Sequence, residues 1–260
     1  MRLLIVDAMN LIRRMYAAAE GNELALEATQ SRCLSVIARN AEQIAATHVA
    51  MVFEQKCITW RHEVWPSYKE GRAPMPQELE QGLDALRRYL QQAGVFCLDL
   101  AGWEGDDVVA SLALRAAFAG LEVDIMSTDK GFCQLVNSRL RVRNHFDRFT
   151  WDEDMVRNRF GLAPSQLADF WALTGDTTNH LPGVEGIGPK TAGQLLDQYR
   201  SLDLILAQLD HLDSRTRNAL QKGWQNALLT RALATLRADV PLGFNLHELR
   251  WHGAAAPNQG

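Results

Sequence analysis

Residues 3–7 read Leu3-Leu4-Ile5-Val6-Asp7, four apolar residues followed by an acid. An unbroken apolar run of this length predicts a strand that is buried on both faces, as in a parallel sheet. Short runs in which apolar residues predominate recur three times in the first half of the chain, at residues 49–53, 95–98 and 123–126. Between these runs the apolar residues repeat at helical spacing, at residues 26–45, 77–93 and 104–119. The alternation predicts an α/β fold with a mostly parallel sheet flanked by helices.

The chain changes character after about residue 151. From there the apolar pattern is helical only, at residues 152–160, 164–174, 189–198, 201–209 and 213–237. We therefore predict an α/β core over residues 1–150, which includes an irregular segment at about 55–80, and a helical region over residues 151–250. The end of the chain is low in apolar content from Gly253 onward, so residues 251–260 are predicted to form a disordered tail.

Composition indicates a soluble globular protein, because 47% of the 260 residues are hydrophobic and 22% are charged. No apolar run approaches the ~20 residues that span a bilayer, and the first ten residues make a poor signal peptide. The four cysteines are widely spaced and lack zinc-site spacing, as expected of a reduced, cytoplasmic protein. The net charge of −4 argues mildly against a nucleic-acid partner, but a total can hide a local separation of acids and bases.

Three acids lie just past the carboxyl end of a predicted strand: Asp7, Glu54 and Asp129. Ligands of open parallel sheets bind beyond the carboxyl ends of the strands, so these side chains should meet at one edge. The helix that begins at the same edge opens with three more acids: Glu104, Asp106 and Asp107. Any one of them alone is more often a turn residue or a favourable first-turn residue of a helix. Their coincidence at one edge favours a functional cluster.

Carboxylates gathered at one point repel each other unless a cation lies between them. Hard oxygen ligands suit Mg²⁺, or Mn²⁺, rather than zinc. Mg²⁺ sites of this kind support attack of water on a phosphodiester. The cluster therefore indicates metal-assisted phosphodiester chemistry.

Two further segments bear on a nucleic-acid partner. Residues 60–72 mix Arg and Lys, which can hold phosphates, with Trp and Tyr, which can stack on unpaired bases. A solvated loop whose aromatic residues plug the core explains the same segment equally well. Residues 181–191 place a Gly-x-Gly turn, Gly186 to Gly188, before Pro189 and Lys190. This predicts a helix-hairpin-helix that exposes backbone N–H groups to a phosphate. Its bland alternative is a plain connector between helices.

Taken in order, these motifs resemble the 5′-nuclease family, which includes the nuclease domain of bacterial DNA polymerase I and the phage flap endonucleases. The matching stretches are Asp7-Ala-Met-Asn10, Phe53-Glu54, Tyr68-Lys69-x-x-Arg72, Glu104-x-Asp106-Asp107, Ser127-Thr128-Asp129-Lys130 and Gly183-x-x-Gly186-Ile187-Gly188-Pro189-Lys190-Thr191. The resemblance covers roughly residues 1–240. It implies a PIN-like α/β core with a helical arch and a C-terminal helix-three-turn-helix, also called a helix-hairpin-helix.

The resemblance also implies roles for the matching residues. Six acids would hold the first metal cluster, directly or through water: Asp7, Glu54, Glu104, Asp106, Asp107 and Asp129. Lys69 and Arg72 would lie on the arch and contact the scissile region, and Lys69 or Lys130 would help to neutralise developing charge. The duplex backbone would be held by Gly186, Ile187, Gly188, Pro189, Lys190 and Thr191.

The chain departs from the family pattern at three places. Glu54 stands where Asp is usual, Gly131 replaces a carboxylate after Asp129-Lys130, and Asn179 replaces the last acid of the Gly-Asp-x-x-Asp pattern. Asp176 is the acid that remains of the second, more distant metal site. This loss resembles the stand-alone bacterial members of the family. There the resemblance implies a degenerate second site and a K⁺ ion held by the backbone carbonyls of Leu173, Thr174, Pro182, Val184 and Ile187.

The leading hypothesis is a Mg²⁺-dependent flap endonuclease that cuts 5′-flap or branched DNA near the single-strand/duplex junction, in replication or repair. No membrane and no obligate protein partner are inferred. The alternative is a structure-specific DNA-binding protein with lost or weak catalysis, motivated by Gly131 and Asn179. The surviving acids of the first site favour the enzyme, because they repel DNA and a protein that only binds DNA has no reason to keep them together. A PIN-like ribonuclease is a third possibility, weakened by the helix-hairpin-helix.

Overall fold

The computed structural model describes residues 1–21 and 24–254. A six-stranded sheet, in the order β3-β2-β1-β4-β5-β6, forms its centre. The strands are β1 (Arg2–Asp7), β2 (His48–Val52), β3 (Phe96–Leu98), β4 (Glu122–Met126), β5 (Leu140–Asn144) and β6 (Phe149–Trp151). All neighbours pair in parallel except β6, which is antiparallel to β5. The four strands predicted from apolar runs are confirmed, and β5 and β6 are additions that the pattern search missed.

Strand β1 lies in the middle of the sheet and is buried on both faces. Leu3 and Ile5 pack into the hydrophobic cluster on one face, whereas Leu4 and Val6 pack into the cluster on the other. All four side chains are fully buried. Alternate side chains of a strand point to opposite faces, so an uninterrupted apolar run is what a two-sided core requires.

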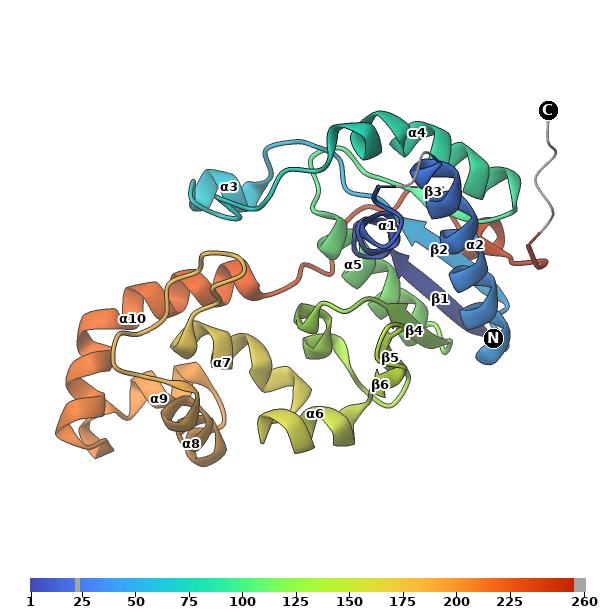
Figure 1. Cartoon of the computed structure of the whole chain (residues 1–260). Helices are drawn as coiled ribbons and strands as arrows, with labels where there is room; N and C mark the ends of the chain where they lie inside the picture. Colours follow the sequence, from blue (N-terminus) through green and yellow to red (C-terminus); the bar gives the residue numbers. More distant parts are fainter. Residues whose placement is uncertain (22–23, 255–260) are drawn as a thin grey trace.

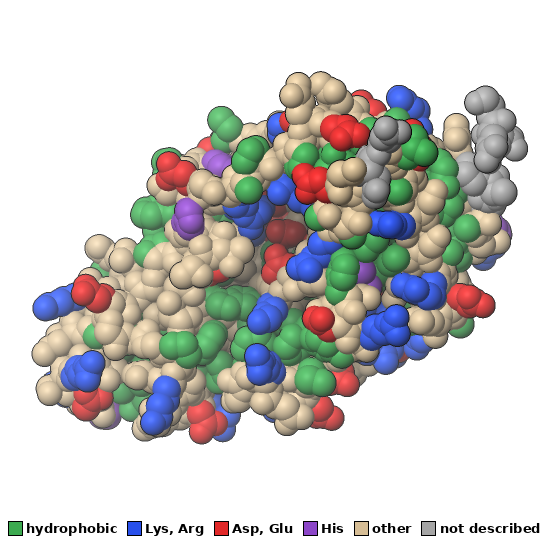
Figure 2. Space-filling view, in the orientation of Figure 1, with side chains coloured by type: hydrophobic (Ala, Val, Ile, Leu, Met, Phe, Trp, Pro, Cys, Tyr) green, Lys and Arg blue, Asp and Glu red, His purple; other side chains and the backbone are tan. Residues whose placement is uncertain are grey.

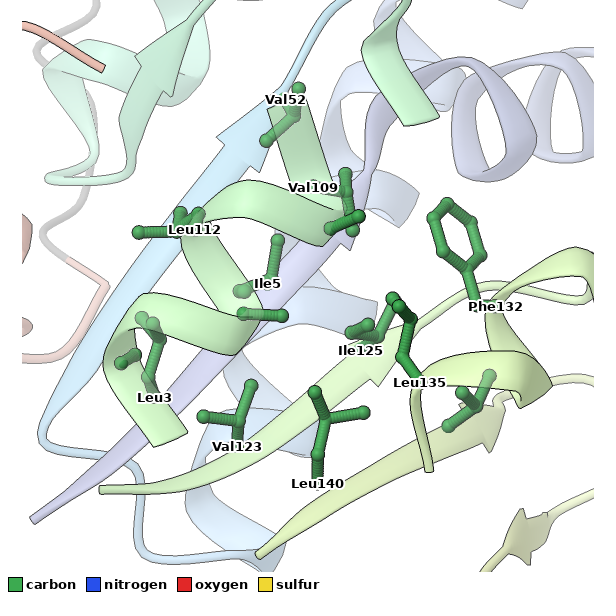
Figure 3. Packing of buried hydrophobic residues seen from close by; sticks show 14 of the residues in the cluster. Leu3, Ile5, Val52, Val109, Leu112, Val123, Ile125, Phe132, Leu135 and Leu140 are labelled. Atoms are coloured by element: carbon green, nitrogen blue, oxygen red, sulfur yellow. The ribbon is translucent and has the colours of Figure 1, made fainter. Parts of the chain in front are cut away.

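Helices cover both faces of the sheet (Figure 1). Three of them share the cluster that includes Leu4 and Val6: α1 (Ala8–Ala17), α2 (Ala25–Gln43) and α4 (Gln77–Gln92). Helix α5 (Gly105–Phe118) covers the opposite face. Figure 3 shows Val109 and Leu112 of α5 lying over Ile5 of the central strand. This packing holds the first turn of α5 at the carboxyl edge of the sheet.

A helical unit lies beside the α/β core and has its own hydrophobic cluster. It is built from α6 (Glu153–Phe160), α7 (Leu167–Thr174), α8 (Pro189–Tyr199), α9 (Leu202–Ala207) and α10 (Ser214–Ala234), with short 3₁₀ turns at η2 (Pro164–Gln166) and η3 (Leu209–His211). The core carries one such turn, η1 (Lys130–Leu135), after β4. Helix α3 (Trp60–Val64) projects from the core above this unit (Figure 1).

The predicted boundaries of the helical region, residues 151–250, and of the tail, residues 251–260, need a correction. After α10 the chain returns to the α/β core, where Val240, Leu242 and Leu249 join the sheet's hydrophobic cluster. The return ends with η4 (Leu246–Leu249) and a hydrogen bond of 3.0 Å from the Trp251 N–H to the Thr47 carbonyl. The ordered chain therefore extends past the predicted start of the tail, because apolar side chains in an irregular segment carry no periodic signal. Residues 255–260 of that tail lie outside the described residues.

Across residues 1–21 and 24–254, no helix combines the length and apolar character needed to cross a membrane.

Candidate metal and DNA-binding site

The structure brings five of the six predicted acids to the carboxyl edge of the sheet. Asp7 ends β1, Glu54 follows β2 and Asp129 follows β4, while Glu104 and Asp106 stand at the start of α5. The start of α5 lies against Glu54, since a Cβ placed on Gly105 would be 3.4 Å from the Glu54 Cβ. Figure 2 shows acidic side chains at the base of a hollow in this region, with Lys and Arg side chains around it.

Asp7 is a helix cap as well as a member of the cluster. Its carboxylate accepts hydrogen bonds from the Asn10 N–H (3.1 Å) and the Ser127 hydroxyl (2.8 Å), which fix its direction. Burial is the largest influence on its ionisation, and the charges of Asp129 and Glu54 add to it. Together they raise the pKa of Asp7 from 3.8 to about 6, despite the two hydrogen bonds. A cation bound beside Asp7 would therefore favour its ionised form.

The pKa of Asp106 is raised for the same reasons as that of Asp7. Burial raises the pKa of Asp106 well above its usual range, and the negative charges of Asp129, Asp7 and Glu54 raise it further against the opposing effect of Lys69. The four groups must therefore lie close enough to influence one another. Lys69 is the positive side chain that opposes this rise in the pKa of Asp106.

Lys69 supplies that positive charge. Its ammonium nitrogen lies 2.6 Å from Glu104 Oε2, 3.3 Å from Glu54 Oε1 and 3.9 Å from Asp106 Oδ2. Burial opposes its protonation, but the surrounding acids, Asp106 and Glu54 foremost, raise the pKa of Lys69 overall. Its backbone lies in the left-handed region, at φ 57°, which is uncommon for a residue with a side chain. The chain thus bends so that Lys69 reaches into the acids.

Glu104 is buried beneath this cluster. It is 1% exposed, and it accepts hydrogen bonds from the Thr59 hydroxyl and the Lys69 ammonium, both at 2.6 Å. Burial alone would raise its pKa, but Lys69 and Thr59 outweigh burial and lower the pKa of Glu104. Glu104 therefore stays ionised and anchors Lys69.

Asp107 does not join the cluster, which corrects the prediction that it helps to hold the metal. It is fully buried, and both of its oxygens bind the Arg61 guanidinium, at 2.6 and 2.8 Å. The Trp60 indole N–H and the Arg237 backbone N–H also donate to it, at 3.3 and 2.9 Å. Successive residues of a helix point about 100° apart, so Asp106 and Asp107 cannot both face the same edge.

The carboxyl ends of β1 and β4 are tied together by Asn10, Ser127 and Thr128, to which the sequence analysis assigned no role. The Asn10 side chain donates to the Thr128 hydroxyl (2.9 Å) and accepts from the Thr128 N–H (3.1 Å). The Ser127 hydroxyl, which donates to Asp7, also accepts from the Asp129 N–H at 3.0 Å. These residues hold Asp7 and Asp129 in register. Their presence in the motifs around both acids was the available signal.

The predicted arch segment contacts the helical unit rather than hanging free. Arg72 donates to the Asn179 side-chain oxygen (2.6 Å), the Lys69 N–H to the Asn179 carbonyl (3.3 Å), and the Trp65 indole N–H to the His180 carbonyl (3.2 Å). Asn179 in turn donates to Asp176 at 2.5 Å. The amide at position 179 thus occupies Asp176 with a hydrogen bond where a second carboxylate would have repelled it.

Lys130 and Gly131 follow Asp129 at the start of η1. Lys130 is exposed there, and the Gly131 N–H donates to Asp129 Oδ1 at 2.7 Å. A Cβ at position 131 would lie 3.1 Å from that oxygen. Glycine at this position therefore leaves room around Asp129 and contributes no charge.

The predicted hairpin lies between α7 and α8. Gly186 adopts φ 85°, Gly188 caps α8, and Pro189 is its first residue. Gly186, Gly188, Pro189 and Lys190 are exposed and Thr191 is half-buried, whereas Ile187 is buried in the helical cluster. The exposed start of α8 with its backbone N–H groups suits a phosphate.

Close backbone contacts shape the inner side of the hairpin, where the five predicted carbonyls lie. The Val184 N–H donates to the Leu173 carbonyl (2.9 Å), the Ile187 N–H to the Val184 carbonyl (3.0 Å), and the Thr230 hydroxyl to the Pro182 carbonyl. A Cβ on Gly183 would lie 2.8 Å from the Thr174 carbonyl oxygen, so the backbone at Gly183 packs closely against the backbone at Thr174. Each such carbonyl retains a second lone pair that a cation can use.

The donor set fits a hard divalent cation. Two acids have raised pKa values, and the Lys69 ammonium lies among three carboxylates in the position of a counter-ion. In the described part of the chain, no three Asp, Glu, His or Cys side chains are already arranged to hold a metal ion. Mg²⁺ commonly keeps several waters and uses one or two carboxylates, so an open cluster of this kind remains compatible with it.

Comparison with known proteins agrees with this geometry. Residues 2–161 match the family model of the 5′-3′ exonuclease N-terminal resolvase-like domain, and residues 162–257 match its C-terminal SAM fold. The chain therefore belongs to the 5′-3′ exonuclease family.

Its curated relatives include Flap endonuclease Xni of Cronobacter sakazakii, which is 41% identical over 253 residues and covers 96% of this chain and 98% of the relative. Flap endonuclease Xni of Aeromonas salmonicida is 43% identical over 254 residues, 96% of both chains. These relatives, also called exonuclease IX, match the stand-alone bacterial members that the sequence resembles.

Solved structures show the same fold. The phage T5 D15 protein crystallised with metal ions superposes with a TM-score of 0.76 at 20% identity, covering 91% of this chain and 90% of that one. The catalytic core of Rad2 in complex with DNA substrate superposes with a TM-score of 0.60 at 14% identity, covering 98% and 83%. T5 5′-exonuclease is also known with divalent zinc bound, at a TM-score of 0.77 and 20% identity over 91% and 90% of the chains.

Proposed function

We propose that this protein is a Mg²⁺-dependent 5′-flap endonuclease that hydrolyses a phosphodiester near the single-strand/duplex junction, in DNA replication or repair in the cytoplasm. The observation that carries the proposal is the group of carboxylates at the edge of the sheet, where Asp7 and Asp106 have raised pKa values and the Lys69 ammonium lies 3.9 Å from Asp106. A protein that only bound DNA would gain nothing from such a group, because it repels phosphate.

Asp7, Glu54, Asp106 and Asp129 are the residues that would hold Mg²⁺, with Glu104 acting from beneath. Mg²⁺ bound there would supply an activated water and stabilise the charge on the attacking and leaving oxygens. Lys69 lies beside the same carboxylates, so its ammonium can also neutralise charge on the scissile phosphate. Mn²⁺ has similar ligand preferences and should substitute.

The surfaces around the cluster support a branched DNA substrate. Lys69 and Arg72 lie on the segment that bridges the core and the helical unit, and Arg72 is exposed. Residues 186–191 present an exposed helix start and Lys190, which suits the backbone of a duplex. In this proposal the hairpin holds the duplex while the bridging segment guides the 5′ strand, and K⁺ at the carbonyls of Leu173, Thr174, Pro182, Val184 and Ile187 would link the hairpin to a phosphate.

A panel of labelled DNA substrates tests the proposal. A 5′ flap, a blunt duplex and a single strand of the same sequence are incubated with the protein in Mg²⁺ and in chelator, and the products are sized. We expect cutting of the flap near its junction in Mg²⁺ only. Equal cutting of all three substrates, or cutting in chelator, would refute it.

A second candidate function is structure-specific DNA binding without cleavage. Asn179 and Gly131 favour it, since each stands where a carboxylate of the family pattern is missing. Tight flap binding with no cleavage in Mg²⁺, Mn²⁺ or Zn²⁺ would establish this alternative and would show that the missing acids were needed.

A further inference from the structure

Arg61 is the largest fully buried side chain in the described part of the chain, at 1% exposure. It extends from α3 in the bridging segment to Asp107 on α5, the residue next to Asp106. Its guanidinium makes two hydrogen bonds to the Asp107 carboxylate, at 2.6 and 2.8 Å. An arginine is rarely buried so fully unless it is paired, and a bidentate Arg–carboxylate pair fixes the geometry of both partners.

The remaining donors of Arg61 reach a third part of the chain. Its Nε donates to the Leu233 carbonyl at 2.8 Å and its Nη2 to the Thr235 carbonyl at 3.1 Å. These carbonyls lie at the end of α10, where the chain leaves the helical unit and returns to the core (Figure 1). The Arg237 N–H closes the arrangement by donating to Asp107 at 2.9 Å.

Trp60 completes the junction. Its indole N–H donates to Asp107 at 3.3 Å. Its ring lies under two guanidinium groups, with that of Arg61 at 4.6 Å and that of Arg237 at 5.9 Å. A single carboxylate, Asp107, therefore holds the bridging segment, the first turn of α5 and the return from the helical unit.

The α5 end of this junction is fixed. Helix α5 packs on the sheet through Val109 and Leu112, as Figure 3 shows. The other two partners are the five-residue helix α3 and an irregular connection. The connection is also held by Gln134 of η1, which donates to the Ala234 carbonyl and accepts from the Leu236 N–H, and by Ser111 of α5, which donates to the Arg237 carbonyl. Arg61 joins α3 and this connection to the first turn of α5.

We propose that the Arg61–Asp107 pair is a positioning joint that sets the bridging segment, and with it Lys69, against Asp106, and that couples the position of the helical unit to the acidic cluster. Arg61 and Asp107 act through their neighbours and touch neither metal nor DNA. The proposal rests on the proposed flap cleavage. It predicts that loss of the joint separates binding from cleavage. None of the hydrogen bonds of Arg61 or Asp107 in the described chain reaches residues 186–191, which would hold the duplex, whereas Lys69 follows Arg61 in the same segment.

The test replaces both partners together, as Arg61→Met with Asp107→Leu. Removing one partner alone would leave a buried charge, whereas replacing both with apolar residues of similar size commonly preserves folding. The matched control is Arg231→Met with Asp203→Leu, a pair of 2.8 Å within the helical unit. Arg61→Lys is a second variant, which keeps the charge beside Asp107 but loses the fork that reaches Leu233 and Thr235.

Single-turnover cleavage of the 5′ flap is the first readout. We expect the double variant and Arg61→Lys to bind the flap as the wild type does, to cleave about 10- to 100-fold more slowly, as small misplacement of a catalytic group commonly causes, and to cut at several positions. The control pair should match the wild type. A cleavage rate and cut position like those of the wild type in both Arg61 variants would overturn the proposal.

A Mg²⁺ titration separates this role from metal binding. The half-maximal Mg²⁺ concentration should stay unchanged in the double variant. A raised requirement caused by Asp107→Leu, whether or not Arg61→Met is present, would mean that Asp107 acts on the metal and would refute the joint.

Hydrogen exchange of the metal-free, DNA-free protein gives a readout that does not depend on activity. Residues 60–72 and 233–237 should lose protection together in the double variant and keep it in the control pair. Unchanged protection of both segments would refute the joint. If the wild type itself fails to cleave, the proposed function fails, and the exchange measurement still decides whether Arg61 aligns these segments.

Discussion

Replacing Asp7 by Asn should stabilise the metal-free protein. Asn carries no charge, yet it caps helices as well as Asp does, and its side-chain oxygen can still accept from the Asn10 N–H. The pKa of Asp7 rises from 3.8 to about 6 on folding. A rise of this size corresponds to about 3 kcal/mol of lost stability. Because the side chain is partly open to solvent, we expect about 1–2 kcal/mol.

The sign depends on pH. Above pH 6 the carboxyl is ionised in both the folded and the unfolded protein, and the wild type carries the full cost of the crowded charge. As the pH falls from 6 toward 3.8, the folded protein takes up the proton first and the cost shrinks. The advantage of Asp7→Asn should therefore be greatest at pH 7 and small near pH 4.

Thermal unfolding in chelator measures this directly. At about 2–4 °C for each kcal/mol in a chain of this size, the melting temperature of Asp7→Asn should rise by about 2–8 °C at pH 7. The control is Asp152→Asn, which caps α6 by the same hydrogen bond away from the acidic cluster and should change little. A lower melting temperature for Asp7→Asn at pH 7, or an equal gain in the control, would refute the electrostatic reasoning.

Three further variants test other parts of the account. Lys69→Met should lower the free energy of unfolding at pH 7 by about 3 kcal/mol, because it leaves Glu104 buried without its ammonium partner. This loss of stability should shrink below pH 4.5, because Lys69 lowers the pKa of Glu104. Urea titrations at pH 7 and below pH 4.5 measure it, and a loss of stability that does not depend on pH would contradict the prediction. Gly183→Ala should lower the free energy of unfolding by about 1–3 kcal/mol and weaken duplex binding, because its Cβ would lie 2.5 Å from the Gly175 nitrogen. Urea titration measures the stability and fluorescence anisotropy the binding; an unchanged value of either would contradict this prediction. Lys190→Ala should weaken duplex binding for any sequence and reduce the slope of log affinity against log salt by about 0.9; an unchanged slope would exclude a phosphate contact.

The strands of the sheet could be predicted where apolar residues predominate, and β5 could not, because its apolar residues alternate with arginines. Residues 140–144 place Leu140, Val142 and Asn144 toward the interior and Arg141 and Arg143 between them. Because two of its five residues are arginines, a search for apolar runs does not find this short strand, which lies next to the edge strand β6. Helix α1 was missed for a related reason, because it begins directly after Asp7 and leaves no connection to mark its start.

The acidic edge was predictable because each acid follows a strand or opens a helix, and parallel strands end together. The division of labour between Asp106 and Asp107 required the position of Arg61, which lies 46 residues earlier in the chain. Contacts of this kind depend on the tertiary fold and leave no local trace in the sequence. The 100° step between neighbouring helix residues places the two side chains in different directions, a signal that the sequence analysis did not use.

Single-turnover cleavage of one labelled 5′-flap substrate in Mg²⁺ by the wild type and by Asp106→Ala, with flap binding measured in parallel, tests whether the carboxylates at the edge of the sheet hydrolyse the phosphodiester. We expect cutting near the junction by the wild type, and loss of most of that cutting in the variant with nearly unchanged binding. Retained cleavage in Asp106→Ala, at the same position and a similar rate, would show that the carboxylates at the edge of the sheet are not where the phosphodiester is hydrolysed.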